Sequence, residues 1–296
     1  STAYGAQRLA GLVVTYEENE DTQDLAAQVI FGGIGAKGKL PVSASSYFNA
    51  GDGIHSSTAD RFGYTLPEAE GVLTADLKGI DAIAKEGLTM KAYPGCQVLV
   101  AHHGQVIWNK AYGAPSYESK RKARTDDIYD LASVTKVAGT TLALMKLADQ
   151  GKLNVDTTLS AYLPELKNTH PAHARILIRD ILTHQAGLKP YVPFYTRLMK
   201  EGKFKPGVAS DTTNAEHDLR VAYGLYINKS YRDSLYEWVL DTPVGPPGTY
   251  VYSDMGMYLM MEVVERVSGM PLDRFLDEQF YRPLGLSTIG YRPWLR

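Results

Sequence analysis

The sequence predicts a mixed α/β fold, and three observations support this prediction. Two alternating apolar runs, Gln97–Ala101 and Val106–Ala111, are typical of a pair of strands joined by a tight turn. A long run with helical spacing begins at Ser133 and is apolar nearly all round, which predicts a helix that is buried on every side, and Gly151 provides its stop signal. A proline-glycine turn is followed by a second apolar helix that begins near Met255.

The segment before the strand pair predicts a smaller unit. Leu9–Tyr16 has the apolar content of a buried strand, and Thr22–Phe31 has helical spacing. A glycine loop follows, in which Gly33, Gly35 and Gly38 match the dinucleotide-binding fingerprint. That fingerprint requires a helix directly after it, and Pro41 prevents one, so nucleotide binding is excluded.

The composition narrows the function further. The chain has 296 residues, 44% of them hydrophobic, and a formal net charge of -2 from 31 basic and 33 acidic residues. The near balance of charges argues against nucleic-acid binding, and the absence of any run of about eighteen apolar residues argues against a membrane span. Cys96 is the one cysteine, which excludes an internal disulfide, and we expect it to lie in the core.

The helix that begins at Ser133 carries the strongest chemical pattern. Ser133 and Lys136 are three residues apart, so the hydroxyl and the ammonium lie on one helical face. A serine needs an adjacent base to become a nucleophile, and we expect burial to lower the pKa of Lys136 so that it serves as one. The residues alone also allow a capping serine with a snorkelling lysine. A second pair with this spacing, Ser119 and Lys122, lies in a charged run that predicts a surface loop.

The surroundings of Ser133 resemble the serine β-lactamase and penicillin-binding-protein superfamily. The matching segments occur in the order of that family, at Asp130–Lys136, Leu144–Asp156, Tyr162–Pro164, Ile181–Leu188, Pro247–Asp254 and Pro283–Leu286. The resemblance implies an antiparallel sheet with a helical region across residues 72–296. It also implies a serine hydrolase that works through an acyl-enzyme on Ser133.

The same resemblance implies a catalytic tyrosine followed by a polar residue. Tyr252 matches by position and would share proton transfer with Lys136, whereas Tyr226 is a rival with the same spacing to an asparagine. Asp254 stands where the family has asparagine, and it is either a substrate-binding residue or only the N-cap of the next helix. An aspartate accepts hydrogen bonds but does not donate them, which leaves ester, amide and β-lactam substrates open.

The third element of the family, a strand with lysine or histidine, then threonine or serine, then glycine, has no match after Tyr252. We therefore expect the hydrolase domain to be incomplete at its C-terminus and the chain to be part of a longer protein. We also expect the outer edge of the strand pair to lack a partner.

Residues 9–70 resemble the end of the second α/β domain of glycoside hydrolase family 3. The resemblance is carried by Phe31–Gly33, Gly38–Ser43 and Arg61–Tyr64. It implies a glycosidase remnant at residues 1–43, a linker at residues 44–71 and covalent continuity with an upstream glycosidase barrel.

No cofactor or metal is expected. His170-Pro-Ala-His173 lies in a polar loop without a cluster of further ligands. His102-His103-Gly104 resembles the third element of the family, but it falls at the tip of the strand pair, before Ser133, and does not supply that element. His184 is expected to be a structural hydrogen-bonding residue.

The sequence therefore predicts a serine acyl-hydrolase with Ser133, Lys136 and Tyr252 as catalytic residues and Asp254 at the substrate. The expected substrate is a small molecule or a peptidoglycan-derived acyl group, handled outside the cytoplasm. Two alternatives remain: a non-catalytic recognition or sensor module with a vestigial site, and an accessory tail of the glycosidase.

Overall fold

The computed structural model of the protein describes residues 11–32, 34–56 and 62–292. The chain divides into two compact units, residues 1–128 and residues 129–296.

The first described helix lies where the sequence predicted one. Helix α1 (Glu20–Ile30) begins after Asn19, whose side chain accepts a hydrogen bond from the backbone N–H of Thr22 at 2.9 Å. The Thr22 hydroxyl accepts one in return from the Asn19 N–H at 3.1 Å, which completes a capping box.

The strand predicted at Leu9–Tyr16 is not present in its described part. Residues 11–16 form no strand and are exposed to solvent. A buried strand needs a hydrogen-bonding neighbour and an apolar cover, and residues 11–16 find neither among the described residues. Leu9, Gly33 and Arg61, which belong to the predicted strand and to the segments behind the glycosidase resemblance, lie outside the described residues.

A three-stranded sheet forms the centre of the first unit. Its order is β1-β3-β2, with β2 and β3 antiparallel and β1 parallel to β3. The elements are β1 (Gly63–Tyr64), the 3₁₀-helix η2 (Pro67–Glu70), α2 (Thr74–Thr89), β2 (Gly95–His102) and β3 (Gln105–Gly113). The predicted strand pair is thus confirmed. His103 and Gly104 both have positive φ, 48° and 79°, as the two central residues of a type I′ hairpin turn require.

We expected the strand pair to have an unpartnered outer edge, and this holds for β2 but not for all of β3. Strand β1 covers only the Gln105–Val106 end of β3, whereas the outer edge of β2 has no strand partner in the described part of the chain. Helix α2 is tied to β3 by Asp81, which accepts hydrogen bonds from the Tyr112 hydroxyl at 2.8 Å and from the Lys110 ammonium at 3.2 Å.

The second unit is mostly helical. Its helices are η3 (Ala132–Val134), η4 (Lys136–Thr141), α3 (Leu142–Asp149), η5 (Leu159–Ala161), α4 (Leu166–Thr169), α5 (Pro171–Ala174), α6 (Ile178–Leu182), α7 (Tyr195–Leu198), α8 (Tyr231–Leu240), α9 (Met255–Ser268), α10 (Leu272–Leu276) and η6 (Asp277–Tyr281). Its short strands are β4 (Met199–Lys200), β5 (Lys203–Phe204), β6 (Ala209–Ser210), β7 (Leu219–Ala222) and β8 (Leu225–Ile227).

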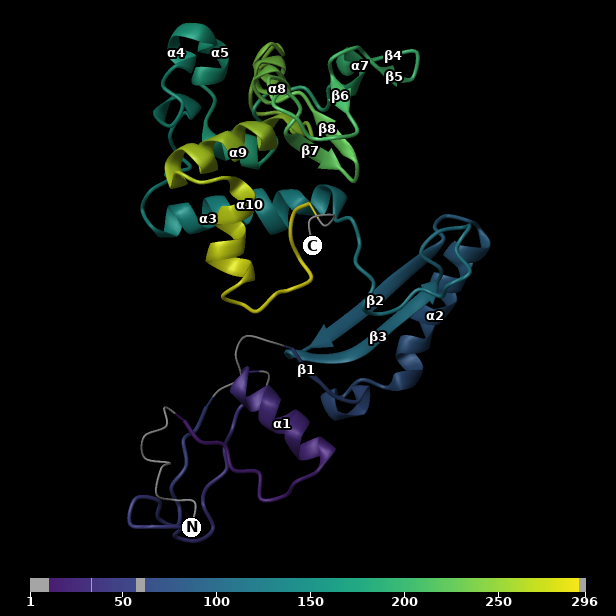
Figure 1. Ribbon diagram of the computed structural model, residues 1–296, viewed down its shortest axis with the longest axis vertical. Coiled ribbons are helices and arrows are strands. Elements are labelled where there is room, and N and C mark those ends of the chain that lie inside the picture. Colours follow the sequence, from purple (N-terminus) through teal and green to yellow (C-terminus); the bar gives the residue numbers. More distant parts are fainter. Residues whose placement is uncertain (1–10, 33, 57–61, 293–296) are drawn as a thin grey trace. The chain divides into compact units, whose positions relative to one another are not determined.

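The core of this unit lies where α3, α9 and α10 pack together (Figure 1). Leu147 of α3, Leu259 and Met260 of α9 and Leu276 of α10 are completely buried. Full burial of a leucine or methionine side chain stabilises a fold by about 1.5–3 kcal/mol. The core thus holds α3, which continues from the Ser133 turn, and α9, which follows Tyr252, in a fixed relation.

The helix that begins at Ser133 is less regular than predicted. It starts as a 3₁₀ turn, continues as the π-helix η4 and becomes α-helical only from Leu142. The Tyr281 hydroxyl donates a hydrogen bond to the backbone oxygen of Ala138 at 3.0 Å. A side chain that hydrogen-bonds to a backbone carbonyl can replace an intrahelical bond at that position, which is one cause of a local π-helix.

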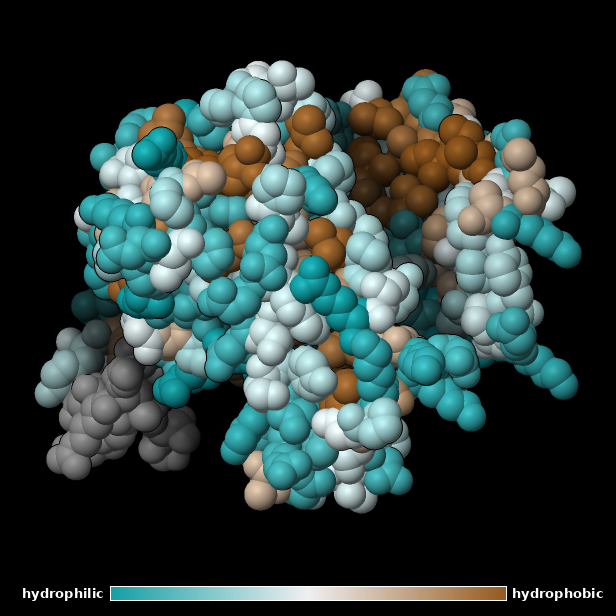
Figure 2. Space-filling model, turned by 90° about the horizontal axis from the view of Figure 1, so that it is seen from above, coloured by the Kyte–Doolittle hydropathy of each residue, from teal (hydrophilic) through white to brown (hydrophobic). Residues whose placement is uncertain are grey.

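The same helix was predicted to be buried all round, and this prediction is wrong. The side chains of Val134, Val137 and Met145 are 57%, 68% and 62% exposed. The core packs on the opposite side, against Leu144 and Leu147, so one apolar stripe faces outward. Figure 2 shows more generally that hydrophobic side chains lie at the surface between hydrophilic ones.

Candidate active site

A tight turn presents Ser133 at the surface of the second unit. The Asp130 carboxylate accepts a hydrogen bond from the Ala132 N–H at 2.8 Å. Ala132 has a φ of 43°, in the left-handed region. This conformation costs a non-glycine residue roughly 1–2 kcal/mol. The strain is typical of a turn whose shape serves to present the next residue, Ser133.

Lys136 joins Ser133 to a distant segment of the chain. Its ammonium donates a hydrogen bond to the Ser133 hydroxyl oxygen at 2.9 Å. The same ammonium forms an ion pair with Asp254 at 2.7 Å and lies 5.0 Å from the ring centroid of Tyr252. The structure thus brings together all four residues that the sequence analysis selected.

The backbone that carries Tyr252 and Asp254 is fixed from the side. The hydroxyl of Ser253, which is buried, donates to the Lys189 carbonyl at 2.6 Å and accepts from the Met255 N–H at 3.2 Å. The Asp254 N–H donates to the Pro190 carbonyl at 2.9 Å. Two segments that are far apart in sequence therefore run alongside each other.

The side chain of Ser253, and not that of Asp254, accepts a hydrogen bond from a backbone N–H at the start of α9. Asp254 occupies the N-cap position, but its side chain makes no capping hydrogen bond. The interpretation of Asp254 as only a helix cap is therefore wrong. Its carboxylate is directed to Lys136 instead.

His184 supports Tyr252, as a structural hydrogen-bonding residue would. Its Nδ1 accepts a hydrogen bond from the Ser253 N–H at 3.2 Å, and its carbonyl accepts one from the Val251 N–H at 2.8 Å. The imidazole lies against the Tyr252 ring, with the ring centroids 4.6 Å apart. Burial, followed by the charge of Lys136, lowers the pKa of His184, so the imidazole is neutral at pH 7.

The electrostatics of Lys136 differ from the expectation. Burial by itself lowers the pKa of Lys136, but the interactions with Asp254 and Tyr252 outweigh it, so the pKa lies above its ordinary value. Lys136 is therefore a protonated donor at neutral pH and not a free base. The prediction of a lowered pKa was wrong because it did not include the carboxylate of Asp254.

Tyr252 shows the opposite shift. The Lys136 ammonium and then the Ser133 hydroxyl favour the ionised phenol, and the pKa of Tyr252 lies below its ordinary value. The charge of Asp254 opposes this shift only in part. Of the groups around Ser133, Tyr252 is therefore the one whose environment favours the ionised form, which is the form able to accept a proton.

The rival residues lie elsewhere in the fold. Tyr226 is on β8, where it is paired with Ser210 and Arg220. Ser119 and Lys122 lie in an irregular segment without a bond between them, as expected of a surface loop. Cys96 is half-buried on β2 and not in the core as expected.

Asp130, Ser253 and the Lys189 and Pro190 carbonyls were not among the site residues predicted from the sequence. An aspartate two residues before Ala132 is a turn signal that could have indicated Asp130. A serine just before an apolar helix could likewise have indicated Ser253. The two carbonyls carry no side-chain signal at all.

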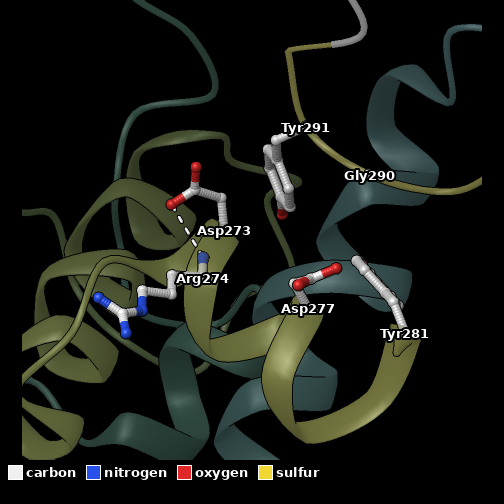
Figure 3. Close-up of a pocket in the computed structure, with 6 residues that line it drawn as sticks. All are labelled: Asp273, Arg274, Asp277, Tyr281, Gly290 and Tyr291. Atoms are coloured by element: carbon white, nitrogen blue, oxygen red, sulfur yellow. Dashed lines mark hydrogen bonds between the residues drawn. The ribbon is translucent and has the colours of Figure 1, made fainter. Parts of the chain in front are cut away.

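A cavity of about 290 Å³ lies apart from this cluster, between α10, η6 and the chain near Tyr291 (Figure 3). Two carboxylates, Asp273 and Asp277, line it. They form ion pairs with Arg292 and Arg282, respectively. The cavity includes none of the predicted site residues, so the open cluster around Ser133 remains the candidate active site.

Comparison with known proteins identifies the family of the chain. Residues 80–295 match the Beta-lactamase family. The chain belongs to this family.

Two curated relatives are similar to this chain over about three quarters of its length. The N-acetylmuramyl-L-alanine amidase of Bacillus subtilis (strain 168) is 32% identical over 74% of this chain and 47% of its own length. The protein named "Putative D-alanyl-D-alanine carboxypeptidase" of Escherichia coli (strain K12) is 31% identical over 78% of this chain and 50% of its own length. The chain spans about half the length of these relatives.

A solved structure confirms the fold class. The octameric penicillin-binding protein homologue from Pyrococcus abyssi superimposes with a TM-score of 0.54 and 21% identity, covering 72% of this chain and 44% of that one. The β-lactamase-like fold predicted from the resemblance is thus confirmed. None of the described helices combines the length and hydrophobicity that a bilayer span requires.

Proposed function

We propose that this member of the β-lactamase family is a serine acyl-hydrolase. The Ser133 oxygen attacks the carbonyl carbon of an amide or ester, and its proton is transferred to the Tyr252 oxygen. The bond to the leaving group then breaks as Tyr252 returns the proton to that group. Water hydrolyses the Ser133 ester, which releases the acid and restores the hydroxyl.

One observation carries this proposal. The Lys136 ammonium lies 2.9 Å from the Ser133 oxygen and 2.7 Å from Asp254, and it also lies beside Tyr252. Because Lys136 donates to the serine oxygen, the serine proton is free to point to Tyr252. Asp254 keeps Lys136 protonated, and Lys136 keeps the pKa of Tyr252 low.

The proposed substrate is an acyl group of a peptidoglycan-derived peptide, or a related ester, handled outside the cytoplasm. The names of the two curated relatives support this class. The carboxylate of Asp254 only accepts hydrogen bonds and is already paired with Lys136. It therefore keeps Lys136 protonated and does not donate a hydrogen bond to a substrate carbonyl.

A second candidate function is an acylated recognition or sensor module. The aspartate at position 254 favours it, because the family motif has asparagine there. In such a module Ser133 accepts an acyl group but does not release it.

The glycosidase resemblance of residues 9–70 stays a prediction. So do the upstream glycosidase barrel and the alternative that the chain is an accessory tail of that glycosidase. The sequence of the parent reading frame tests all three.

Covalent labelling of the 296-residue protein separates these functions. A fluorescent acylating phosphonate is expected to label the unmodified protein and Ser119→Ala equally and to leave Ser133→Ala unlabelled. Ser119 is the matched control because it also has a lysine three residues later. Turnover of an activated ester accompanies labelling if the protein is a hydrolase, whereas labelling without turnover identifies the sensor. Equal labelling of Ser133→Ala would refute both.

A further inference from the structure

A second polar cluster lies at the tip of the β2–β3 hairpin, within the first unit. Strand β1 runs along this tip, where the Gly63 N–H donates to the Gly104 carbonyl at 2.9 Å and the Thr65 N–H donates to the Val106 carbonyl at 3.1 Å. The chain then forms η2, whose last residue is Glu70. The Glu70 carboxylate, which is far from the hairpin in sequence, therefore lies next to His102 and His103.

The two histidine rings point to the same carboxylate oxygen. The Nδ1 atoms of His103 and His102 lie 3.2 Å and 3.7 Å from the same Glu70 oxygen. In a regular strand, neighbouring side chains point to opposite faces. The left-handed conformation of His103 removes this alternation, and the two imidazole centroids are only 3.8 Å apart.

One nitrogen of this cluster has no hydrogen-bond partner. The Nδ1 of His102 is buried and makes no hydrogen bond with any described residue, since 3.7 Å to Glu70 is too long for one. A buried nitrogen without a partner carries a cost of about 1–3 kcal/mol. A bound cation at the centre of the cluster would remove that cost.

We propose that Glu70, His102 and His103 bind a divalent transition-metal ion of the zinc type. Imidazole nitrogens and a carboxylate oxygen are ligands that zinc takes, with bonds of about 2.0–2.2 Å and tetrahedral geometry. Two such ligand atoms stand about 3.3–3.5 Å apart, as follows from those bond lengths. The observed 3.2 Å and 3.7 Å enclose this range, and all three ligand atoms lie within 4.8 Å of one another.

The site holds three protein ligands, so water completes the tetrahedron. No metal was expected from the sequence, in which only the pair of histidines at the hairpin tip is visible. The structure adds a third possible ligand, Glu70, from η2. A bound ion would cross-link η2 to the hairpin tip, and the proposal is independent of the chemistry at Ser133.

Titration of the metal-free full chain with zinc chloride tests the proposal. Calorimetry is expected to show one site per chain that is lost in His103→Ala and weakened roughly tenfold or more in Glu70→Gln. His55→Ala is the matched control, because His55 is an exposed histidine outside the cluster. It is expected to bind zinc as the unmodified protein does. Absence of binding, or equal affinity in all four proteins, would overturn the proposal.

Thermal unfolding provides a second measurement, which also shows whether each variant is folded. Without zinc, Glu70→Gln and His55→Ala are expected to unfold at closely similar temperatures. At one fixed zinc concentration, zinc is expected to raise the unfolding temperature of the unmodified protein and of His55→Ala equally and that of Glu70→Gln by less, because an ion that binds only the folded state stabilises it more the more tightly it binds. A zinc-induced increase of the same size in Glu70→Gln would show that zinc binds elsewhere.

Discussion

Replacing Asp254 by asparagine is expected to shift the pH range in which Ser133 is acylated toward lower pH. Asp254 raises the pKa of Lys136, so removal of its charge lowers that pKa. The charge of Asp254 also raises the pKa of Tyr252, although other groups outweigh it, so its removal lowers this pKa further. In the proposed mechanism, acylation requires ionised Tyr252 and protonated Lys136. Both limbs of the pH profile therefore move in the same direction.

The structure indicates a strong interaction between the two charges that set the alkaline limb. The Lys136 ammonium and the Asp254 carboxylate are 2.7 Å apart. Two unit charges at that distance interact by about 1.5 kcal/mol at the dielectric constant of bulk water. The side chains are only 15% and 30% exposed, so their interaction is screened less than in water, and removal of the carboxylate lowers the pKa of Lys136.

The assay is the second-order rate of phosphonate labelling, measured from acid to alkaline pH, which does not depend on turnover. The alkaline limb of Asp254→Asn is expected to lie at lower pH than that of the unmodified protein, because the pKa of Lys136 falls when the carboxylate is removed. The acid limb is expected to move the same way by a smaller amount, because Asp254 is a minor influence on Tyr252.

Asp156→Asn is the control. It also removes a carboxylate from an ion pair in the second unit, with Arg179 at 2.6 Å, but that pair is exposed and does not include Ser133, Lys136 or Tyr252. Its labelling profile is expected to match that of the unmodified protein. An unchanged profile for Asp254→Asn, or a shift to higher pH, would refute the assignment of the two limbs to Lys136 and Tyr252.

Three further predictions concern stability and are measured by thermal and urea denaturation. Gly256→Ala is expected to destabilise the protein by about 1–3 kcal/mol, because its new methyl group would stand 2.6 Å from a methyl carbon of Ile181 in the core. Gly79→Ala should instead stabilise the protein by about 0.5–1 kcal/mol, because the new methyl group on the exposed helix α2 would meet no other atom within 4 Å. A loss of stability in Gly79→Ala would contradict the packing argument. Tyr281→Phe is expected to cost about 1 kcal/mol, because its hydroxyl donates to the Ala138 carbonyl; no change would show that this bond does not contribute.

Local sequence patterns were sufficient for several features of this protein. The hairpin followed from alternating apolar residues on both sides of a turn that tolerates positive φ at His103 and Gly104. The proximity of Ser133 and Lys136 followed from helical spacing alone. In each case the contact lies within a few residues of chain, so backbone geometry determines it.

The remaining features depended on tertiary structure. The direction of the Lys136 pKa shift was mispredicted because Asp254 reaches the ammonium only after the chain has folded back. The outward stripe with Val137 was mispredicted because spacing shows which residues share a face but not which face finds a partner. Glu70 likewise meets His103 only through the pairing of β1 with β3. Charge states, burial and multi-residue sites depend on groups that the fold brings together from distant positions, and one-dimensional spacing carries no information about those distances.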